Sequence, residues 1–343
     1  MPLPSDVVPL VREFASNSFR YLFRQVDNVA DLLHWREPKI ARGIDFTRMA
    51  VQPETFIAPT FAQLESDVIL RAPFRVRRGR NGSIEIFILI EHQSEPDELM
   101  VFRVIRYVVL IYERQATEWL QTHPNLRKFR FSPVLPVVFY SGRRTWDELK
   151  PMAELVQQGK LFEKRWPTLE PEFVNLSTTD AGVLQKKSGL FGWVLWLIQQ
   201  KHQKRATFHD VMHQAVAQVD KQSDTNVGRL QSLLWFMQSL LYHDREPAEH
   251  GPLAELIRST VRKSMQPEVD AMSKTIAQTL KEEGNIEGTR NAFLFQLRKK
   301  FENVPESILA EIRATTDHHQ LETWLDAILT AETITDIPFK SRP

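Results

Sequence analysis

Two carboxylates and an amide have a spacing that could hold a metal ion. Asp67 opens one short apolar run and Glu91 closes a second, each twelve positions from Gly79. An antiparallel hairpin that turns near this glycine makes the two acids cross-strand neighbours, with Cβ atoms about 4.5–5.5 Å apart. Facing carboxylates repel each other unless a cation lies between them. Gln93 is expected on the same strand face as Glu91, whereas His92 points away.

An oxygen-rich site of this kind suits a hard divalent cation such as Mg²⁺. Such a cation lowers the pKa of a bound water and stabilises charge on a phosphodiester as the leaving oxygen departs. In the alternative interpretation, Asp67 and Glu91 are ordinary acids that flank a hairpin. Spacing alone does not decide between the two.

The elements that would position these residues can be predicted from apolar periodicity. Helical spacing over residues 8–33 precedes two apolar runs, 67–70 and 84–90, which the Gly- and Asn-containing stretch 77–82 separates as in a hairpin. Residues 101–112 then show the pattern of a helix that buries one face. Residues 134–140 form an apolar run typical of a buried strand, in which Pro136 fits best near a strand end or edge. The predicted order is helix, strand, strand, helix, strand.

The second half of the chain is predicted to be all-α, because no strand pattern appears after about residue 180. Helices are predicted over residues 184–200, 208–219 and 227–241. Residues 267–302 are rich in Lys, Glu, Gln and Ala, with Gly284 and Gly288 as interruptions, and a helical pair near 305–312 and 321–330 follows. We therefore expect a core over residues 1–180, a helical extension over 181–265 and a helical tail over 266–343.

Charge is balanced over the whole chain, with 44 Lys and Arg against 43 Asp and Glu, so any nucleic-acid-binding face must be local. Arginines around the predicted hairpin could contact phosphates, with Phe74 among them as a stacking or packing group. These are Arg71, Arg75, Arg77, Arg78 and Arg80. A hairpin tip with solvated charges is the alternative.

Several other classes of chemistry have little support. The chain has no cysteine, which excludes disulfides and thiolate metal sites and fits a reducing compartment. No secretion signal begins the sequence, and the longest apolar stretch, 190–198, is too short for a bilayer, so we expect a cytoplasmic protein without membrane contact. No phosphate-binding loop or dinucleotide fingerprint indicates a nucleotide cofactor. His209 and His213 superficially resemble a zinc-protease pair, but Asp210 replaces the catalytic Glu and no third ligand follows.

Four motifs together resemble a known family. They are Ser66-Asp67-Val-Ile-Leu, then Leu89-Ile-Glu91-His92-Gln93-Ser94, then the stretch 100–107, then residues 135–142 with Trp146. Their order is similar to the core of the PD-(D/E)XK nuclease superfamily, in which Gln sometimes replaces the motif Lys. More specifically, they resemble the Rpn, or YhgA-like, family, with Glu-His-Gln-Ser as the most telling string. Residues 282–290 and 321–329 also resemble that family's C-terminal segment.

The resemblance implies an α/β fold with a PD-(D/E)XK restriction-endonuclease-like core, a mixed sheet flanked by helices, and an all-α C-terminal extension. It implies a metal-dependent DNA endonuclease that could promote recombination. By analogy, Asp67, Glu91 and the carbonyl of His92 would bind Mg²⁺ or Mn²⁺, and Gln93 would orient the attacking water or the scissile phosphate. Gln93 cannot supply the charge of a Lys. Arg103 joins the hairpin arginines as an expected DNA contact.

One departure from the family pattern lies in the predicted N-terminal helix. Ala15-Ser16 stands where relatives often have His-Asp, just before the pair Phe19-Arg20. The alternative function is therefore a catalytically weak DNA-binding or protein-interaction module on a nuclease-like scaffold, in which the helical C-terminal region could form a homo-oligomer. The family's transposase label has less support here, because no separate DNA-binding domain or acidic triad was found.

Overall fold

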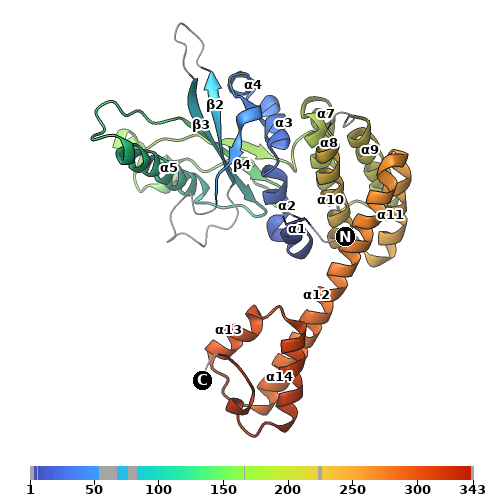
Figure 1. Cartoon of the computed structure of the whole chain (residues 1–343). Coiled ribbons are helices and arrows are strands. Elements are labelled where there is room, and N and C mark those ends of the chain that lie inside the picture. Colours follow the sequence, from blue (N-terminus) through green and yellow to red (C-terminus); the bar gives the residue numbers. More distant parts are fainter. Residues whose placement is uncertain are drawn as a thin grey trace. The chain divides into compact units, whose positions relative to one another are not determined.

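The computed structural model describes residues 4–5, 7–53, 68–75, 83–165, 167–222 and 226–340 (Figure 1). Two compact units make up the chain. One contains residues 5–270, and the other contains residues 271–343 with residues 1–4. In the described ranges, no helix is both long enough and apolar enough to cross a bilayer.

The unit of residues 5–270 contains a five-stranded mixed sheet in the order β1-β2-β3-β4-β5. β1 pairs with β2 and β2 with β3 antiparallel, whereas β3, β4 and β5 run parallel. The strands are β1 (Ala50–Val51), β2 (Val68–Arg75), β3 (Ser83–Gln93), β4 (Val134–Tyr140) and β5 (Glu172–Asn175). The predicted α/β fold is confirmed at this level.

The β2–β3 hairpin has the register that the sequence predicts. Val68 faces Ile90, and Arg75 faces Ser83. The next pair in this register would be Asp67 and Glu91, but Asp67 lies outside the described residues. The observed ladder therefore supports the predicted alignment up to the residue before the acid pair.

Helix α5 (Met100–Thr122) covers one face of the sheet, as the periodicity of residues 101–112 predicted. Its apolar side packs with alternate strand residues such as Phe87 and Leu89 from β3 and Val138 from β4. Since side chains alternate between the faces of a strand, Glu91 lies on this same face, toward α5.

Short helices cover the opposite face, where Phe19 and Phe23 pack against Phe139 (Figure 1). The one or two helices predicted over residues 8–33 are three, because the backbone leaves helical geometry at Glu13, with φ −129° and ψ 55°, and at Gln25. The N-terminal helices are α1 (Val8–Arg12), α2 (Phe14–Phe23), α3 (Val26–Arg36) and α4 (Pro38–Ala41).

Pro136 lies inside β4, opposite Leu89, in the part of the strand that only β3 pairs. The ladder between β4 and β5 begins at Val137. Proline has no backbone N–H to donate to a neighbouring strand. Its position just before the β4–β5 pairing begins therefore agrees with the predicted preference for a strand end or edge.

Further helices of this unit follow β5, and some of them pack on the N-terminal helices: α8 contacts α3, and α10 contacts α1 and α2. These contacts join residues 181–270 to the sheet-containing part as one compact unit, so a boundary at residue 180 stays a prediction. The helices are α7 (Ala181–Lys187), α8 (Gly189–Gln199), α9 (Arg205–Gln222), α10 (Val227–Asp244) and α11 (Pro247–Thr260).

The prediction of a single helix over residues 184–200 was wrong, because two helices form there and the second begins at Gly189. This glycine has a φ of +56°, and a Cβ there would lie 2.4 Å from the carboxylate of Asp31. That carboxylate also accepts a hydrogen bond from the backbone N–H of Phe191 at 3.0 Å. The break therefore lets the start of α8 approach α3 closely.

The other unit is helical, as predicted. Helix α12 (Gln266–Lys300) starts in the first unit and runs through Gly284 and Gly288 without interruption, so these glycines do not divide it as expected. α12, α13 (Glu306–Ala314) and α14 (His318–Thr330) share an apolar core that includes Phe293 and Trp324. The minor elements are η1 (Phe46–Arg48), α6 (Met152–Leu155), η4 (Gly159–Arg165), η5 (Lys263–Met265) and η6 (Ile334–Asp336).

Candidate active site

Glu91 lies near the end of β3 with its side chain fully buried (0% exposed). Its Oε1 accepts hydrogen bonds from Arg103 Nη2 at 2.7 Å and from Gln93 Nε2 at 2.9 Å. Its Oε2 is also buried and has no hydrogen-bond partner among the described residues. A buried carboxylate oxygen without a partner is costly, so this atom indicates a missing ligand or partner.

Arg103 brings a positive charge to this carboxylate from the first turn of α5. Its Nη1 bonds Asp97 Oδ2 at 2.8 Å, so the guanidinium bridges Asp97 and Glu91. Burial acts to lower the pKa of Arg103, but the hydrogen bonds and the charge interactions with Tyr107 and Asp97 together raise it above its usual value. The sequence placed Arg103 among the DNA contacts. The structure places it at Glu91, and direct contact with DNA stays a prediction.

Gln93 and His92 lie on opposite faces of β3, as predicted. The Gln93 amide bonds Glu91, whereas the His92 ring stacks on Phe19 with centroids 3.9 Å apart, and its Nε2 lies 2.8 Å from Ser141 Oγ. Desolvation, together with the charge of Lys201, lowers the pKa of His92 to about 3. The imidazole is therefore neutral at neutral pH and does not face the carboxylate.

The main chain of His92 is directed differently from its side chain. Main-chain groups of a strand alternate between its two neighbours, and both Phe87 N and Gln93 O bond residues on the β4 side. The His92 carbonyl, one residue before that of Gln93, is therefore directed to the β2 side, beyond the last described residue of that strand.

The neutral state of His92 leads to a prediction about pH. Because its folded pKa lies below the unfolded value near 6.5, the unfolded state binds a proton first as the pH falls. The free energy of unfolding should fall below pH ~6.5, by up to about 1.4 kcal/mol per pH unit from this group. Urea denaturation of metal-free protein at several pH values tests this. His92→Gln should flatten the profile and exposed His213→Gln should not; equal profiles for wild type and His92→Gln would contradict the prediction.

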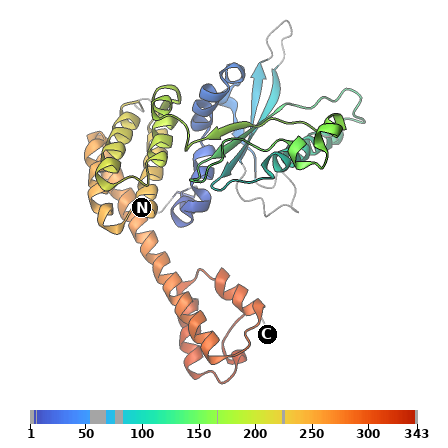
Figure 2. The same ribbon diagram turned by 180° about the vertical axis from the view of Figure 1, so that it is seen from behind.

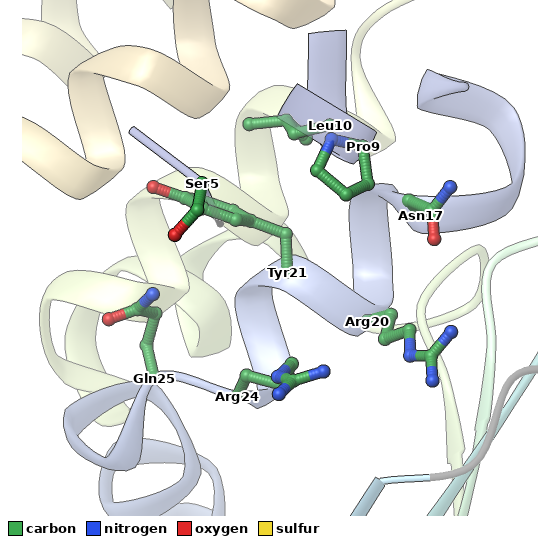
Figure 3. A pocket seen from close by; sticks show the side chains of 8 residues that line it. All are labelled: Ser5, Pro9, Leu10, Asn17, Arg20, Tyr21, Arg24 and Gln25. Carbon is green, nitrogen blue, oxygen red and sulfur yellow. The ribbon is translucent and has the colours of Figure 1, made fainter. Parts of the chain in front are cut away.

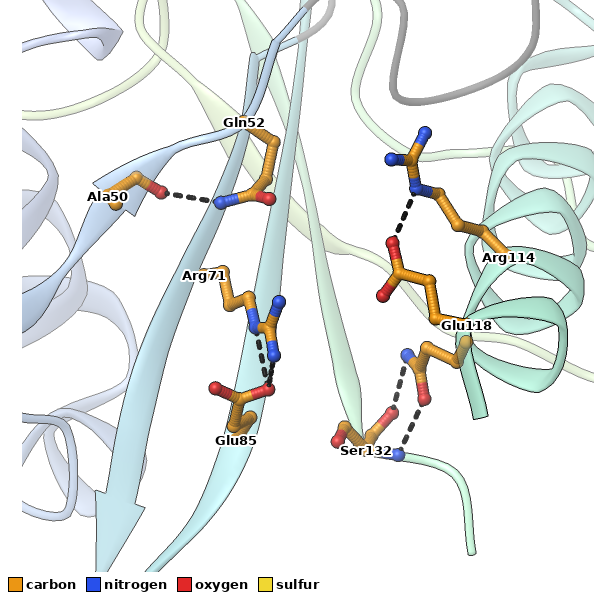
Figure 4. Close-up of polar contacts among 8 residues, drawn as sticks. Ala50, Gln52, Arg71, Glu85, Arg114, Glu118 and Ser132 are labelled. Atoms are coloured by element: carbon orange, nitrogen blue, oxygen red, sulfur yellow. Dashed lines mark hydrogen bonds and ion pairs between the residues drawn. The ribbon is translucent and has the colours of Figure 1, made fainter. Parts of the chain in front are cut away.

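The hairpin arginines have separate surroundings. Arg71 bonds Glu85 through its Nε at 2.6 Å (Figure 4). Its guanidinium lies over the ring of Phe87. Arg75 is exposed at the end of β2. Arg77, Arg78 and Arg80 lie outside the described residues. Phe74 packs closely against Gly43, so packing is the role that the structure shows for it.

One oxygen in the described part of this site is suited to bind a divalent cation. Oε2 of Glu91 is an acidic oxygen that lacks a partner among the described residues, and oxygen atoms of this kind are preferred ligands of Mg²⁺. Asp67, the second predicted ligand, lies outside those residues. The described residues do not form a group of three His, Asp or Glu that could hold a metal by themselves. The same finding leaves His209 and His213 on α9 without a third zinc ligand.

A pocket of about 280 Å³ lies beside α1 and α2 (Figure 3). Among the residues that line it are Asn17, Arg20, Tyr21 and Arg24. Arg20 follows Phe19, which stacks on His92, so α2 presents one residue to the sheet and the next to the pocket. Sequence reasoning noted Arg20 only as part of the family pattern and missed the pocket, because residues four apart on a helix carry no signal of a cavity.

The fold and site together define an α/β protein with a buried carboxylate, an amide and a guanidinium at the end of a central strand. Residues 16–228 match the family described as "Putative transposase, YhgA-like", and the chain belongs to this family. The resemblance that the Glu-His-Gln-Ser string indicated is thereby confirmed.

Three relatives add detail. The chain is 26% identical over 158 residues to recombination-promoting nuclease RpnD of Escherichia coli O157:H7, which covers 44% of this chain and 56% of RpnD. It is 22% identical over 274 residues to recombination-promoting nuclease RpnC of Escherichia coli K12, and this match covers 78% of this chain and 80% of RpnC. It is 28% identical over 110 residues, 32% of each chain, to RpnE of the same strain, which is named an inactive recombination-promoting nuclease-like protein. The match thus spans about half the length of RpnD, and no solved structure matches the chain significantly.

Proposed function

We propose that this protein is a metal-dependent DNA endonuclease built on a PD-(D/E)XK core, with Glu91 at its centre. One observation carries the proposal: a fully buried carboxylate whose Oε2 has no partner in the described part of the chain. A structural acid at this position would be expected to have both oxygens satisfied. The relatives named as nucleases support the same class of activity.

Glu91, Asp67 and the carbonyl of His92 would hold Mg²⁺ or Mn²⁺. When bound, this cation would supply an activated water and offset negative charge on the phosphodiester. The predicted hairpin register and the direction of the His92 carbonyl toward the β2 side are consistent with this ligand set. The residues of the chain itself then determine where water and phosphate lie.

Gln93 and Arg103 would position the reacting groups. The Gln93 amide, held 2.9 Å from Glu91, can donate its second N–H to a water or a phosphate oxygen beside the carboxylate. Arg103 supplies the fixed positive charge that Gln93 cannot, because its guanidinium lies 2.7 Å from Glu91 and remains one third exposed. Arg71 and Arg75, with Arg77, Arg78 and Arg80, would contact the backbone of DNA.

A second function has a specific observation in its favour. The ion pair with Arg103 gives Glu91 a structural partner without any metal, and one relative is named inactive. A nuclease-like scaffold that binds DNA or another protein without cutting would keep this pair. A homo-oligomer through the helical C-terminal region, and a part in recombination, remain proposals under either function.

Calorimetric titration with Mn²⁺ and Mg²⁺, alongside a plasmid-nicking assay in each cation, tests the proposed function. We expect saturable binding of the cation and nicking that depends on it. Nicking requires no knowledge of the target sequence, since a supercoiled plasmid offers many sites. A folded protein that neither binds Mn²⁺ nor nicks would contradict the nuclease proposal and favour the scaffold alternative.

Substitution of Gln93 separates positioning from metal binding. Gln93→Ala removes the amide that would orient water or phosphate, so nicking should fall by about 10- to 100-fold while Mn²⁺ affinity changes little. Gln93→Lys restores a cation at this position and should retain measurable nicking. Nicking rates and calorimetry on the two variants decide this. A loss of Mn²⁺ binding equal to the loss of nicking would make Gln93 a ligand instead.

A further inference from the structure

The connection between α5 and β4 is an exposed loop that alternates cations with aromatic rings. Residues 123–132, which we call the basic-aromatic loop, contain Arg127, Lys128 and Arg130 interleaved with Phe129 and Phe131. The three cations are exposed, and Phe131 is 54% exposed although it is a large apolar residue. Phe131 is thus an exposed aromatic ring that lies directly beside three exposed cations.

Specific hydrogen bonds connect the loop to α5 at both of its ends. At its end, the buried side chain of Gln115 on α5 accepts from Ser132 N at 2.8 Å and donates to Ser132 O at 3.3 Å (Figure 4). At its start, Trp119 Nε1 donates to Asn125 O at 2.9 Å, and Asn125 Oδ1 accepts from Arg127 N at 3.0 Å. The loop is therefore a built surface fixed to a long helix.

The aromatic rings form a continuous cluster along this surface. Phe131 lies between Tyr112, with centroids 4.6 Å apart, and Phe129, at 4.8 Å. Phe129 in turn contacts Trp119, whose indole stacks on His123 at 3.6 Å. Contacts with Tyr112 and Phe129 hold the ring of Phe131, and the residue nevertheless remains 54% exposed.

Among the described residues, nothing offsets the charge of the loop. Arg127, Lys128 and Arg130 form no ion pair within the part of the chain that the structure describes, and Arg130 Nη1 donates only to the carbonyl of Phe129. On the neighbouring stretch of α5, Glu118 is already paired with Arg114 (Figure 4). Three exposed cations beside an open aromatic ring are complementary to a flexible polyanion that carries flat rings.

We propose that the basic-aromatic loop binds single-stranded DNA, with the three cations on phosphates and Phe131 stacked on an unpaired base. Every base has a face that can stack on an aromatic ring, so this mode needs no particular sequence. A peptide of acidic residues alone would satisfy the cations but would leave the exposed ring of Phe131 without a complementary group. The choice of DNA over other polyanions rests on the proposed function.

The loop lies apart from the candidate active site. It leads into β4 at Val134, which pairs with Phe87, four residues before Glu91 on β3. That separation is about 13 Å along the strand. The loop would therefore hold a strand near the site without taking part in the chemistry.

Fluorescence anisotropy with a labelled single strand and its duplex, in EDTA to prevent cleavage, tests the proposal. The triple variant Arg127→Gln, Lys128→Gln, Arg130→Gln should bind the single strand about 10- to 100-fold more weakly, and its log–log salt slope should fall by about 2. Phe131→Leu keeps apolar contacts but removes the ring, so it should weaken single-strand binding about 5- to 100-fold and duplex binding much less.

The matched control removes three exposed cations elsewhere in the same unit, Lys186→Gln, Lys187→Gln, Lys204→Gln. The affinity of this control for the single strand should stay within about 3-fold of wild type.

The proposal is overturned if both triple variants behave alike, if Phe131→Leu binds the single strand normally, or if the triple variant of the loop loses only the binding of a poly-glutamate peptide. If the wild-type protein binds the single strand in EDTA but never nicks, only the proposed nuclease function is contradicted. If the wild-type protein nicks and the triple variant of the loop binds the single strand normally, only the present inference is contradicted.

Discussion

Glu91→Gln is expected to reduce nicking in Mg²⁺ by about 1000-fold or more, because the ionised oxygen that would bind the cation becomes a neutral amide. Mn²⁺ affinity should fall with it. The side chain keeps its size, and Arg103 keeps Asp97 as a partner at 2.8 Å. The free energy of unfolding should therefore fall by only about 1–3 kcal/mol, the cost of weakened hydrogen bonds at a buried site. Nicking rates, calorimetry and urea denaturation measure the three effects.

Glu85→Gln is the matched control for Glu91. Glu85 lies on the same strand, pairs with Arg71 and is 43% exposed, so its loss should leave nicking nearly unchanged. Asp67→Asn should reproduce the Glu91→Gln result if Asp67 is the second ligand. A Glu91→Gln protein that nicks at the wild-type rate would end the assignment of this site. If the wild-type protein does not nick and Glu91→Gln lowers only the free energy of unfolding, the Glu91–Arg103 pair is structural.

Arg245→Met is expected to lower the free energy of unfolding by about 3–5 kcal/mol, since it leaves the carboxylate of Glu249 buried and unpaired. The two side chains are each only 8% exposed and form a two-point pair at 2.8 and 2.9 Å. Arg245 also donates to the carbonyls of Lys201 and Gln203, and its guanidinium lies 4.5 Å from the ring centroid of Phe208. The pair thus joins three helical segments. Urea denaturation at neutral pH measures the loss.

The double variant Arg245→Met, Glu249→Leu should recover most of that stability, because no charge then remains buried. The exposed i,i+4 pair Arg114–Glu118, with both side chains 39% exposed, provides the contrast. Arg114→Met should cost about 0.5 kcal/mol or less. If Arg245→Met is no more destabilising than Arg114→Met, the pair is not a structural anchor of this unit.

The hairpin and α5 could be predicted because local pattern determines both. The apolar runs of β2 and β3 flank a Gly-rich stretch symmetrically, and this symmetry is enough to set the register of Val68 opposite Ile90. The i, i+3, i+4 pattern of residues 101–112 determines which side of α5 is buried. In contrast, β1 and β5 have two and four residues, too few for an alternating pattern to appear.

The partners of Glu91 could be predicted only in part. Gln93 follows from the two-residue period of a strand, whereas Arg103 depends on how α5 is rotated and placed over the sheet. That placement results from packing with Phe87 and Leu89, which no local spacing encodes. For the same reason, the sequence did not predict that Gln115 would hold the basic-aromatic loop.

The opposite orientation of Glu91 and His92 makes β3 intolerant of changes in length. A one-residue insertion between Phe87 and Glu91 would exchange the two faces for every later residue of the strand. The carboxylate would then meet the rings of Phe19 and Phe139, and the imidazole would face α5. Among functional homologues, insertions and deletions are therefore expected outside this strand segment, and a homologue with a single-residue gap inside it should have lost the site, whatever residues it retains.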